Sequence, residues 1–212
     1  MTRILYLHGF ASGPNSAKAR FFADRFLALG VPLEIPALDE GDFERLTLSS
    51  QLALIERRAA GEPVSLIGSS LGGYLAALYA AGHGEVERLV LLAPAFAFGR
   101  RWPETLGAEP VARWKAEGAM EVFHYGEGRT RRLHYGLIED AAIHPDFPDF
   151  RQPALIFHGA QDDVVPAAYS ERFAAGHPNA QLEILDSGHD LFNVLDYMAA
   201  RASDFLSGAA GR

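Results

Sequence analysis

Short apolar runs alternate along this chain with longer segments of helical periodicity, and this alternation constrains the fold more than any other feature. Strands that are apolar throughout are typical of a parallel sheet with helices covering both faces. The pattern therefore predicts an α/β fold, with a mostly parallel, doubly wound sheet of about six strands. The expected strands are residues 3–8, 33–36, 64–68, 88–93, 154–158 and 181–185. The expected helices are residues 16–29, 46–60, 71–81, 167–175 and 191–206.

The alternation stops between about residues 95 and 151. A helical patch at residues 111–116 precedes "MEVFHYGEGRTRRLHYG", which alternates apolar and polar residues on both sides of a Gly-Glu-Gly turn and predicts a two-stranded hairpin. Long insertions in such folds usually cover the binding site. We therefore expect a single domain over residues 1–212, with a lid or cap at about residues 95–151.

The expected lid is rich in aromatic and basic residues. The aromatic candidates for a substrate pocket are Phe96, Phe98, Trp102, Trp114, Phe123 and Tyr125. The alternative is that these rings form the small core of the insertion itself. Likewise, Arg129, Arg131 and Arg132 either meet an anionic leaving group or form a solvated hairpin tip.

Composition excludes several classes of function. The chain has 212 residues, of which 49% are hydrophobic and 22% charged, as in an ordinary packed domain. The net charge of −8 opposes binding to nucleic acid or to an anionic membrane. No apolar stretch approaches the ~20 residues that span a bilayer, and the N-terminus has no cleavable signal pattern, so we expect a cytoplasmic protein. Cysteine is absent, which excludes a thiol nucleophile.

The stretch "LIGSSLGGY" at residues 66–74 places two serines among glycines, directly after an expected buried strand. Only Ser70 has glycine two positions before and two after it, the Gly-x-Ser-x-Gly frame of a nucleophile elbow. For Ser69 the preceding position is Ile67, whose branched side chain would crowd such a turn. The alternative is a purely structural turn between strand and helix. The expected helix that follows favours Ser70 as a nucleophile.

A serine nucleophile needs a base and a group that orients the base. "HGAQDDVVP" and "DSGHDLF" follow the last two expected strands and supply Asp162 and His189. The chain order Ser70, Asp162, His189 is that of α/β hydrolases, and all three fall at the carboxyl edge of the sheet. Asp163 is expected to face solvent or cap a helix, and Asp186 to fix its own loop.

An ester-cleaving site also needs donors for a tetrahedral oxyanion. The amide that follows the nucleophile belongs to Leu71, and the loop after the first strand, "LHGFASGPNS", offers the amide of Phe10. The alternative for that loop is a strand exit with no catalytic role.

Four motifs give the chain a family resemblance. "ILYLHGFASGPNSAKA" at residues 4–19 and "LIGSSLGGYLA" at residues 66–76 resemble the small YqiA/YcfP-type serine esterases of the α/β-hydrolase superfamily, with further support from "GAQDDVVP" and "SGHDLF". The resemblance implies a hydrolase of carboxylic esters or thioesters without a cofactor. It also implies the roles given above for Ser70, Asp162, His189 and the amides of Phe10 and Leu71.

Other functions stay open on the sequence alone. The same triad serves amidases, lactonases and acyltransferases, and a fold of this kind is also found in non-catalytic binding modules. The chain has no His-Glu-x-x-His pattern and no phosphate-binding glycine fingerprint, so neither a metal nor a nucleotide cofactor is expected. The expected partner is a small acyl ester or thioester, and the oligomeric state is open.

Overall fold

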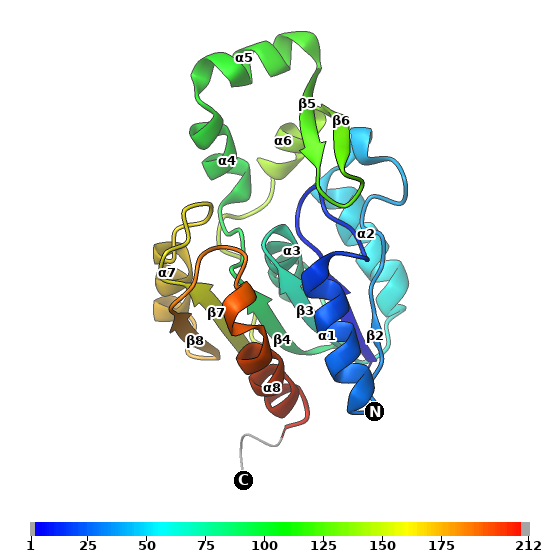
Figure 1. The fold of residues 1–212 in the computed structure, drawn as a ribbon. Helices are drawn as coiled ribbons and strands as arrows, with labels where there is room; N and C mark the ends of the chain where they lie inside the picture. Colours follow the sequence, from blue (N-terminus) through cyan, green and yellow to red (C-terminus); the bar gives the residue numbers. More distant parts are fainter. Residues whose placement is uncertain (1–2, 209–212) are drawn as a thin grey trace.

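The computed structural model describes residues 3–208 and has one six-stranded sheet at its centre (Figure 1). The strand order is β2-β1-β3-β4-β7-β8, and every neighbouring pair is parallel. The strands are β1 (Arg3–Leu7), β2 (Leu33–Glu34), β3 (Val64–Ser69), β4 (Val86–Leu92), β7 (Ala154–Gly159) and β8 (Ala180–Leu185). Because all six run the same way, their carboxyl ends meet at one edge of the sheet.

Helices cover both faces of the sheet, as the predicted doubly wound fold requires. The helices outside residues 95–151 are α1 (Ala17–Ala28), α2 (Leu48–Ala59), α3 (Leu71–Gly82), α7 (Ala168–Gly176) and α8 (Leu195–Leu206), with 3₁₀ turns η1 (Phe43–Arg45) and η2 (Phe192–Val194). Helices α1 and α8 pack on one face, and α2, α3 and α7 pack on the other. The predicted α/β fold, with a parallel, doubly wound sheet of six strands, is thereby confirmed.

Two hydrophobic cores follow from the alternation of side chains along each strand. On β1, Leu5 and Leu7 enter the core with α2, α3 and α7, whereas Ile4 and Tyr6 enter the core with α1 and α8. The central strands β3 and β7 are buried along their whole length. This is why the sequence gives continuous apolar runs rather than an alternating pattern.

The predicted elements agree with the structure except at their ends. Strand β2 is shorter than expected, which suits an edge strand followed by Pro36, since proline has no amide hydrogen to donate. Helix α2 begins after Thr47, whose side chain forms a capping box with Ser50. The last predicted helix is divided into η2 and α8.

Residues 95–151 form α4 (Phe98–Leu106), α5 (Ala108–Glu117), the antiparallel hairpin β5 (Ala119–His124) and β6 (Arg129–His134), and α6 (Gly136–Ala141). The hairpin was predicted; α4 was not, because Pro103 lies inside it and proline usually ends a helix. Figure 1 places this insertion beyond the carboxyl edge of the sheet. Its hairpin tip reaches the loop after β1, where the Gly126 amide donates to the Ala11 carbonyl at 3.3 Å.

No helix within residues 3–208 is long and apolar enough to cross a membrane.

Candidate active site

Ser70 occupies a strained turn between β3 and α3. Its φ of 53° lies in a region that residues with a side chain rarely adopt, and its ψ is −117°. A side chain at Gly72 would clash with the carbonyl oxygen of Leu7, and one at Gly68 would clash with the backbone of Gly72. The glycines of the frame are therefore required by close backbone packing, and the turn holds the Ser70 hydroxyl at the carboxyl edge.

Ser70, His189 and Asp162 form one chain of hydrogen bonds. The His189 Nδ1 atom lies 2.7 Å from Asp162 Oδ2, and His189 Nε2 lies 3.0 Å from Ser70 Oγ. A carboxylate can only accept, so Nδ1 carries the hydrogen and Nε2 is left to accept from the serine hydroxyl. The three residues that the sequence placed after β3, β7 and β8 are thus brought together in the geometry of a nucleophile, a base and an orienting acid.

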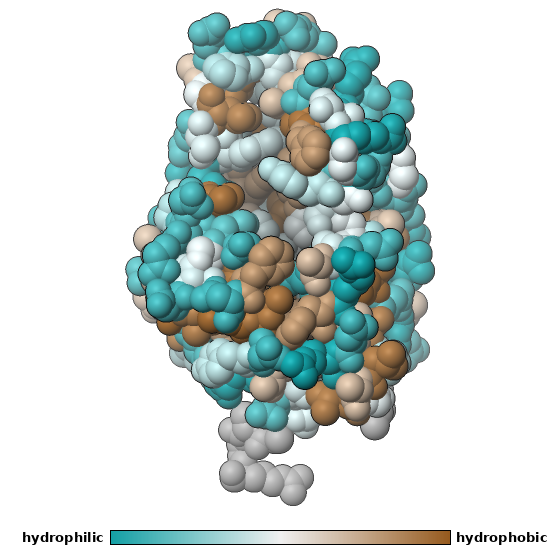
Figure 2. Space-filling view, viewed as in Figure 1, coloured by the Kyte–Doolittle hydropathy of each residue, from teal (hydrophilic) through white to brown (hydrophobic). Residues whose placement is uncertain are grey.

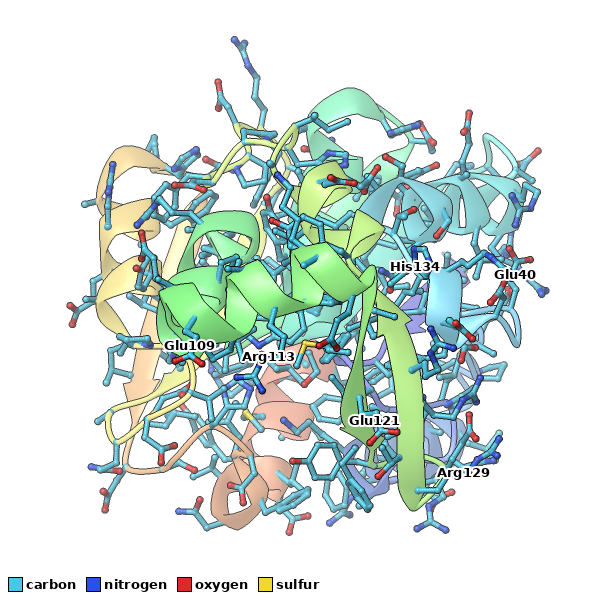
Figure 3. All side chains as sticks on the ribbon, turned by 90° about the horizontal axis from the view of Figure 1, so that it is seen from above. Glu40, Glu109, Arg113, Glu121, Arg129 and His134 are labelled. Atoms are coloured by element: carbon cyan, nitrogen blue, oxygen red, sulfur yellow. The ribbon has the colours of Figure 1, made fainter. Side chains whose placement is uncertain are left out.

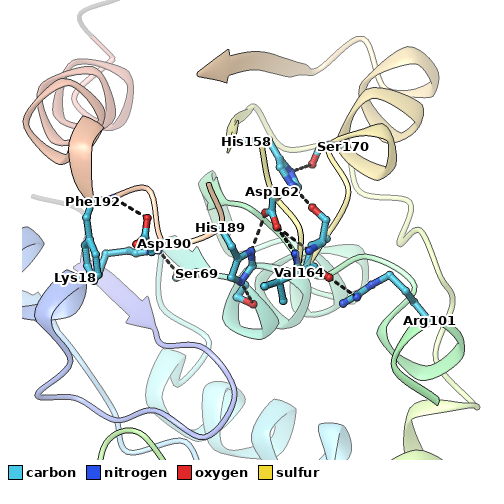
Figure 4. Close-up of polar contacts among 12 residues, drawn as sticks. Lys18, Ser69, Arg101, His158, Asp162, Val164, Ser170, His189, Asp190 and Phe192 are labelled. Atoms are coloured by element: carbon cyan, nitrogen blue, oxygen red, sulfur yellow. Dashed lines mark hydrogen bonds and ion pairs between the residues drawn. The ribbon is translucent and has the colours of Figure 1, made fainter. Parts of the chain in front are cut away.

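The Asp162 carboxylate is surrounded by donors (Figure 4). Its Oδ1 accepts from the amides of Val164 and Val165 at 2.9 and 2.7 Å. Its Oδ2, besides accepting from His189, lies 3.1 Å from Nε2 of the buried His158. That Nε2 also lies 2.7 Å from the Val165 carbonyl, and both neighbours are acceptors, so it carries a hydrogen directed at them.

The environment keeps Asp162 ionised. Burial by itself raises the pKa of this carboxyl, but the hydrogen bonds from His158, His189 and the Val165 amide outweigh burial and hold the pKa well below its usual range. An ionised Asp162 favours the tautomer of His189 that carries its hydrogen on Nδ1.

Further contacts fix the two loops that carry the acid and the base. Arg101 of α4 donates from Nη1 to the Val164 carbonyl at 2.6 Å, which ties the acid loop to the insertion. In the base loop, the Ser187 hydroxyl donates to Asn193 Oδ1 at 2.5 Å, and Asn193 donates to the Asp186 carbonyl at 2.8 Å. Asp186 therefore takes part in loop structure through its backbone.

The two amides expected to bind an oxyanion have no acceptor of their own. Within residues 3–208, neither the Leu71 amide nor the Phe10 amide donates a hydrogen bond. Leu71 is the first residue of α3. The first backbone N–H groups of a helix have no carbonyl of the preceding turn to bind, so they are available to an anion. Gly9, beside Phe10, lies against Ser70: a Cβ built on it would be 3.5 Å from the Ser70 Cβ.

A pocket of about 550 Å³ opens beside Ser70 and His189. Its walls come from the loop after β1, the start of α1, the hairpin, the acid loop and the base loop; they include Phe10, Lys18, Tyr125, Val164 and Phe192. Figure 2 shows the hollow on this side of the molecule, between the insertion and the layers around the sheet.

The six aromatic candidates of the insertion have different positions. Tyr125 lines the pocket, and Phe123 is half-exposed and packs edge-on against its ring at 5.2 Å. Phe98 and Trp102 instead contact Phe10 from outside the pocket wall, with ring centroids 6.3 and 5.0 Å away.

The remaining two rings are buried in packing. Phe96 stacks on Phe173 of α7, with centroids 4.5 Å apart, and Trp114 donates its indole N–H to the Leu133 carbonyl at 2.9 Å. The structure thus brings one of the six candidates, Tyr125, to the pocket. The others form packing contacts, because the insertion is too small to cover the site without first filling its own interior.

The arginines of the hairpin lie among acidic side chains. Arg129 and Arg131 pair with Glu127, and Arg132 lies 3.6 Å from Glu44. Figure 3 shows Arg129 and Glu121 at the hairpin and Glu109 and Arg113 on α5, all on the outer side of the insertion. These contacts favour the solvated hairpin tip over a site for an anionic leaving group.

Asp39, His124 and Glu127 are the described residues whose ligand atoms come close enough to hold a metal ion, within 4.8 Å of one another. His124 Nδ1 already accepts from the Glu127 amide at 3.1 Å, and the Glu127 carboxylate pairs with two arginines. The cluster lies on the hairpin and the loop after β2, and Asp39 Oδ1 likewise accepts from the Gly41 amide at 3.1 Å, so all three residues already have partners.

Sequence reasoning missed two residues of the site. His158 supports Asp162, but it ends an apolar run and gave no signal beyond the end of a strand. Lys18 lies in the first turn of α1, where its Nζ donates to Ser69 Oγ at 3.2 Å, and it lines the pocket with Ser70. Nothing local in the sequence indicates that a residue of the first helix reaches the turn after β3.

Solved structures share this fold over almost the whole chain. Alpha/beta hydrolase domain-containing protein 10 from mouse aligns with a TM-score of 0.80 at 20% identity, over 97% of this chain and 90% of that one. Est1E from Butyrivibrio proteoclasticus, solved with ferulic acid, aligns with a TM-score of 0.82 at 21% identity, over 100% of this chain and 90% of that one. The fold is therefore that of the α/β hydrolases.

The particular family follows from the sequence. Residues 3–206 match the model of Uncharacterised protein family (UPF0227), and the chain belongs to that family. It is also similar to the pimeloyl-[acyl-carrier protein] methyl ester esterases of Xanthomonas oryzae pv. oryzae and Xanthomonas axonopodis pv. citri, each 28% identical over 179 residues, which covers 68% of this chain and 71% of the relative. The expected resemblance to α/β-hydrolase esterases is confirmed by these relatives.

Proposed function

We propose that this protein is a serine esterase that cleaves carboxylic esters or thioesters through Ser70, His189 and Asp162. The observation that carries the proposal is the chain of hydrogen bonds of 3.0 and 2.7 Å from the strained Ser70 turn through His189 to Asp162. The relatives named as esterases support the same class of reaction. A cytoplasmic location and the absence of a cofactor are part of the proposal.

The reaction divides into two acyl transfers. His189 Nε2 takes the Ser70 proton while Oγ forms a bond to the acyl carbon, and the carbonyl electron pair moves to the oxygen. When the tetrahedral intermediate collapses, the bond to the alcohol or thiol breaks and His189 returns the proton to the leaving group. Water, activated by His189, then attacks the acyl-enzyme by the same steps and releases the acid.

The amides of Leu71 and Phe10 would stabilise the oxyanion in both transfers. Both belong to segments in contact with Ser70, and Leu71 adds the positive end of the α3 dipole. Loss of one oxyanion donor typically costs on the order of 10²–10³ in kcat. His158 would act as a positioning residue, because it contacts Asp162 and not the reacting atoms.

The insertion at residues 95–151 would act as a cap with a limited role in binding. Tyr125 reaches the pocket from the hairpin tip, and Arg101 reaches the acid loop from α4. Phe98 and Trp102 would shape the pocket indirectly, by supporting Phe10.

Replacing the Ser70 hydroxyl tests the proposal. Hydrolysis of p-nitrophenyl esters from acetate to palmitate should fall by at least about 10³-fold in Ser70→Ala, because the residual rate then comes from the oxyanion site and binding alone. Ser207→Ala is the matched control, since it removes a serine hydroxyl that donates to the Asp204 carbonyl at the end of α8 and does not line the pocket.

Two results would contradict the proposal. One is a Ser70→Ala protein that keeps most of the wild-type rate. The other is labelling of the wild-type protein by a fluorophosphonate at a residue other than Ser70.

A further inference from the structure

One side of the pocket holds three hydrogen-bonding groups that the triad does not use. The Lys18 ammonium donates to Ser69 Oγ at 3.2 Å, and Tyr6 lies beside both in the pocket wall. They come from α1, the end of β3 and β1, and they line the same pocket as Ser70 and His189. Figure 4 shows Lys18 and Ser69 on the same side of the site as His189. The groups are therefore available to a ligand whose reacting carbonyl lies at Ser70.

Among the described residues the Tyr6 hydroxyl makes no hydrogen bond of ordinary geometry, and the one polar side chain that acts on it is that of Ser69. The side chain is 1% exposed, and its ring packs against Phe22 at 5.7 Å. A buried hydroxyl without a hydrogen bond costs free energy that a suitable ligand would recover. This buried hydroxyl therefore adds a second polar group that a ligand at Lys18 and Ser69 could reach.

Charge indicates the chemistry of that ligand. An ammonium group has three donors, and Lys18 uses one of them on Ser69. Within residues 3–208, no carboxylate lies within 4.0 Å of the Lys18 Nζ. Asp190 lines the same pocket, but its Oδ1 accepts from the Phe192 amide at 3.3 Å. The lysine therefore presents a cation with no direct ion pair, on which Asp190 and Asp162 act from a greater distance.

We propose that Lys18, Ser69 and Tyr6 bind an anionic oxygen group of the substrate, a carboxylate or a phosphate, so that the enzyme prefers esters carrying such a group. The inference rests on the proposed function and specifies its substrate class. Because the Cα atoms of Ser69 and Ser70 are about 3.8 Å apart, the ammonium lies within roughly 12 Å of the Ser70 hydroxyl. The anionic group is thus separated from the scissile carbonyl by a few carbon atoms.

The protonation of Lys18 predicts that the preference for an anionic ester depends on pH. Burial lowers the pKa of Lys18 to about 8, and the charges of Asp190 and Asp162 oppose this decrease. The amine loses its charge as the pH rises through that value. The preference for an anionic ester should therefore be present at pH 7 and largely lost at about pH 9.5.

The experiment compares two methyl esters of nearly equal shape. Monomethyl adipate ends in a carboxylate, and methyl 5-carbamoylpentanoate ends in a neutral amide at the same position. We expect kcat/KM for the anionic ester to be about 10- to 100-fold higher in the wild-type enzyme, as for a charge-assisted hydrogen bond. In Lys18→Met the ratio should fall to about 1. Lys115→Met is the matched control, since Lys115 is the other lysine of the chain and lies over the Tyr135 ring in the insertion.

Tyr6→Phe keeps the ring packing and removes only the buried hydroxyl. It should retain the folded structure and lower the ratio about threefold. A parallel pair, 2-acetoxyethyl phosphate and its uncharged alcohol, shows whether the anionic group is a phosphate on the alcohol side or a carboxylate on the acyl side. A preference in either pair supports the inference.

A binding measurement separates this inference from the proposed function. Adipate should bind Ser70→Ala protein at least about 10-fold more tightly than Ser70→Ala/Lys18→Met protein in calorimetry, with no turnover involved. Equal kcat/KM values in both ester pairs, together with equal adipate binding, would overturn the anion site and leave serine catalysis intact. A Ser70→Ala enzyme with full activity would overturn the proposed function instead.

Discussion

The turns that carry the triad and the insertion above them contribute to the pocket in different ways. The turns are fixed by backbone contacts. Gly68 and Gly72 pack closely against the main chain, and the Asp162 carboxylate accepts hydrogen bonds from two backbone amides of its own loop. The insertion contributes Tyr125, which is 76% exposed, at the tip of a hairpin. The comparison teaches that the reacting atoms are positioned by the main chain, whereas the rim of the pocket depends on side chains.

The largest effect should come from adding one methyl group in the elbow. Gly72→Ala places a Cβ against the carbonyl oxygen of Leu7, and neither backbone can yield without moving β1 from α3. We expect a loss of more than about 3 kcal/mol in the free energy of unfolding, measured by urea denaturation.

The matched control is Gly136→Ala in the insertion. A Cβ there meets no atom within 4 Å, and the position opens α6, so the free energy of unfolding should change by less than about 0.5 kcal/mol. Equal effects of the two substitutions would remove the distinction between the two regions.

A smaller effect is expected from the support of the acid. His158→Phe fills a similar volume but withdraws a hydrogen bond from the buried Asp162 carboxylate. A hydrogen bond to a charged group is worth about 1.5–3 kcal/mol, so kcat should fall about 10- to 100-fold. KM should change little, because His158 does not line the pocket.

The pH dependence of stability checks the same substitution. The lowered pKa of Asp162 stabilises the fold fully above its ordinary value of 3.8, and this contribution is lost as the pH falls through the folded value. Without His158 the folded pKa rises, so acid unfolding should begin at a higher pH. Ser170→Ala removes only the partner of His158 Nδ1 and should leave that onset nearly unchanged.

The smallest effect should come from the rim. Tyr125→Ala removes an exposed ring from the pocket wall, and we expect KM for aryl esters to rise about three- to tenfold with kcat nearly constant. Phe123→Ala, which changes the neighbouring ring outside the pocket wall, is the control. A large fall in kcat for Tyr125→Ala would mean that the hairpin positions reacting groups after all.

The sequence predicted the parts of the site whose signals are local. The Gly68-x-Ser70-x-Gly72 frame is such a signal because its glycines and serine lie within five consecutive residues at the end of a buried strand. Asp162 and His189 were predictable because each directly follows a strand of a parallel sheet, and such strands end at one edge.

The remaining parts depend on contacts between distant segments. Lys18, Ser69 and Tyr6 come from three elements, and the pairing of β1 with β3 together with the packing of α1 against these strands brings them together. Trp114 and Tyr125 are equally aromatic, yet one is buried and the other is exposed at the pocket rim. Composition cannot distinguish these positions, because burial is decided by the packing of the finished fold.

Arg101 also limits which part of the insertion can be exchanged with that of a relative in protein engineering. It lies at the start of the insertion, but its guanidinium donates to the Val164 carbonyl in the loop of Asp162, the proposed catalytic acid. Exchanging all of residues 95–151 for the equivalent region of a relative would therefore alter specificity and damage the acid loop at once. A cassette of residues 107–135, from the end of α4 to the end of the hairpin, would exchange the rim and keep the arginine, so the modular unit of this protein is smaller than its insertion.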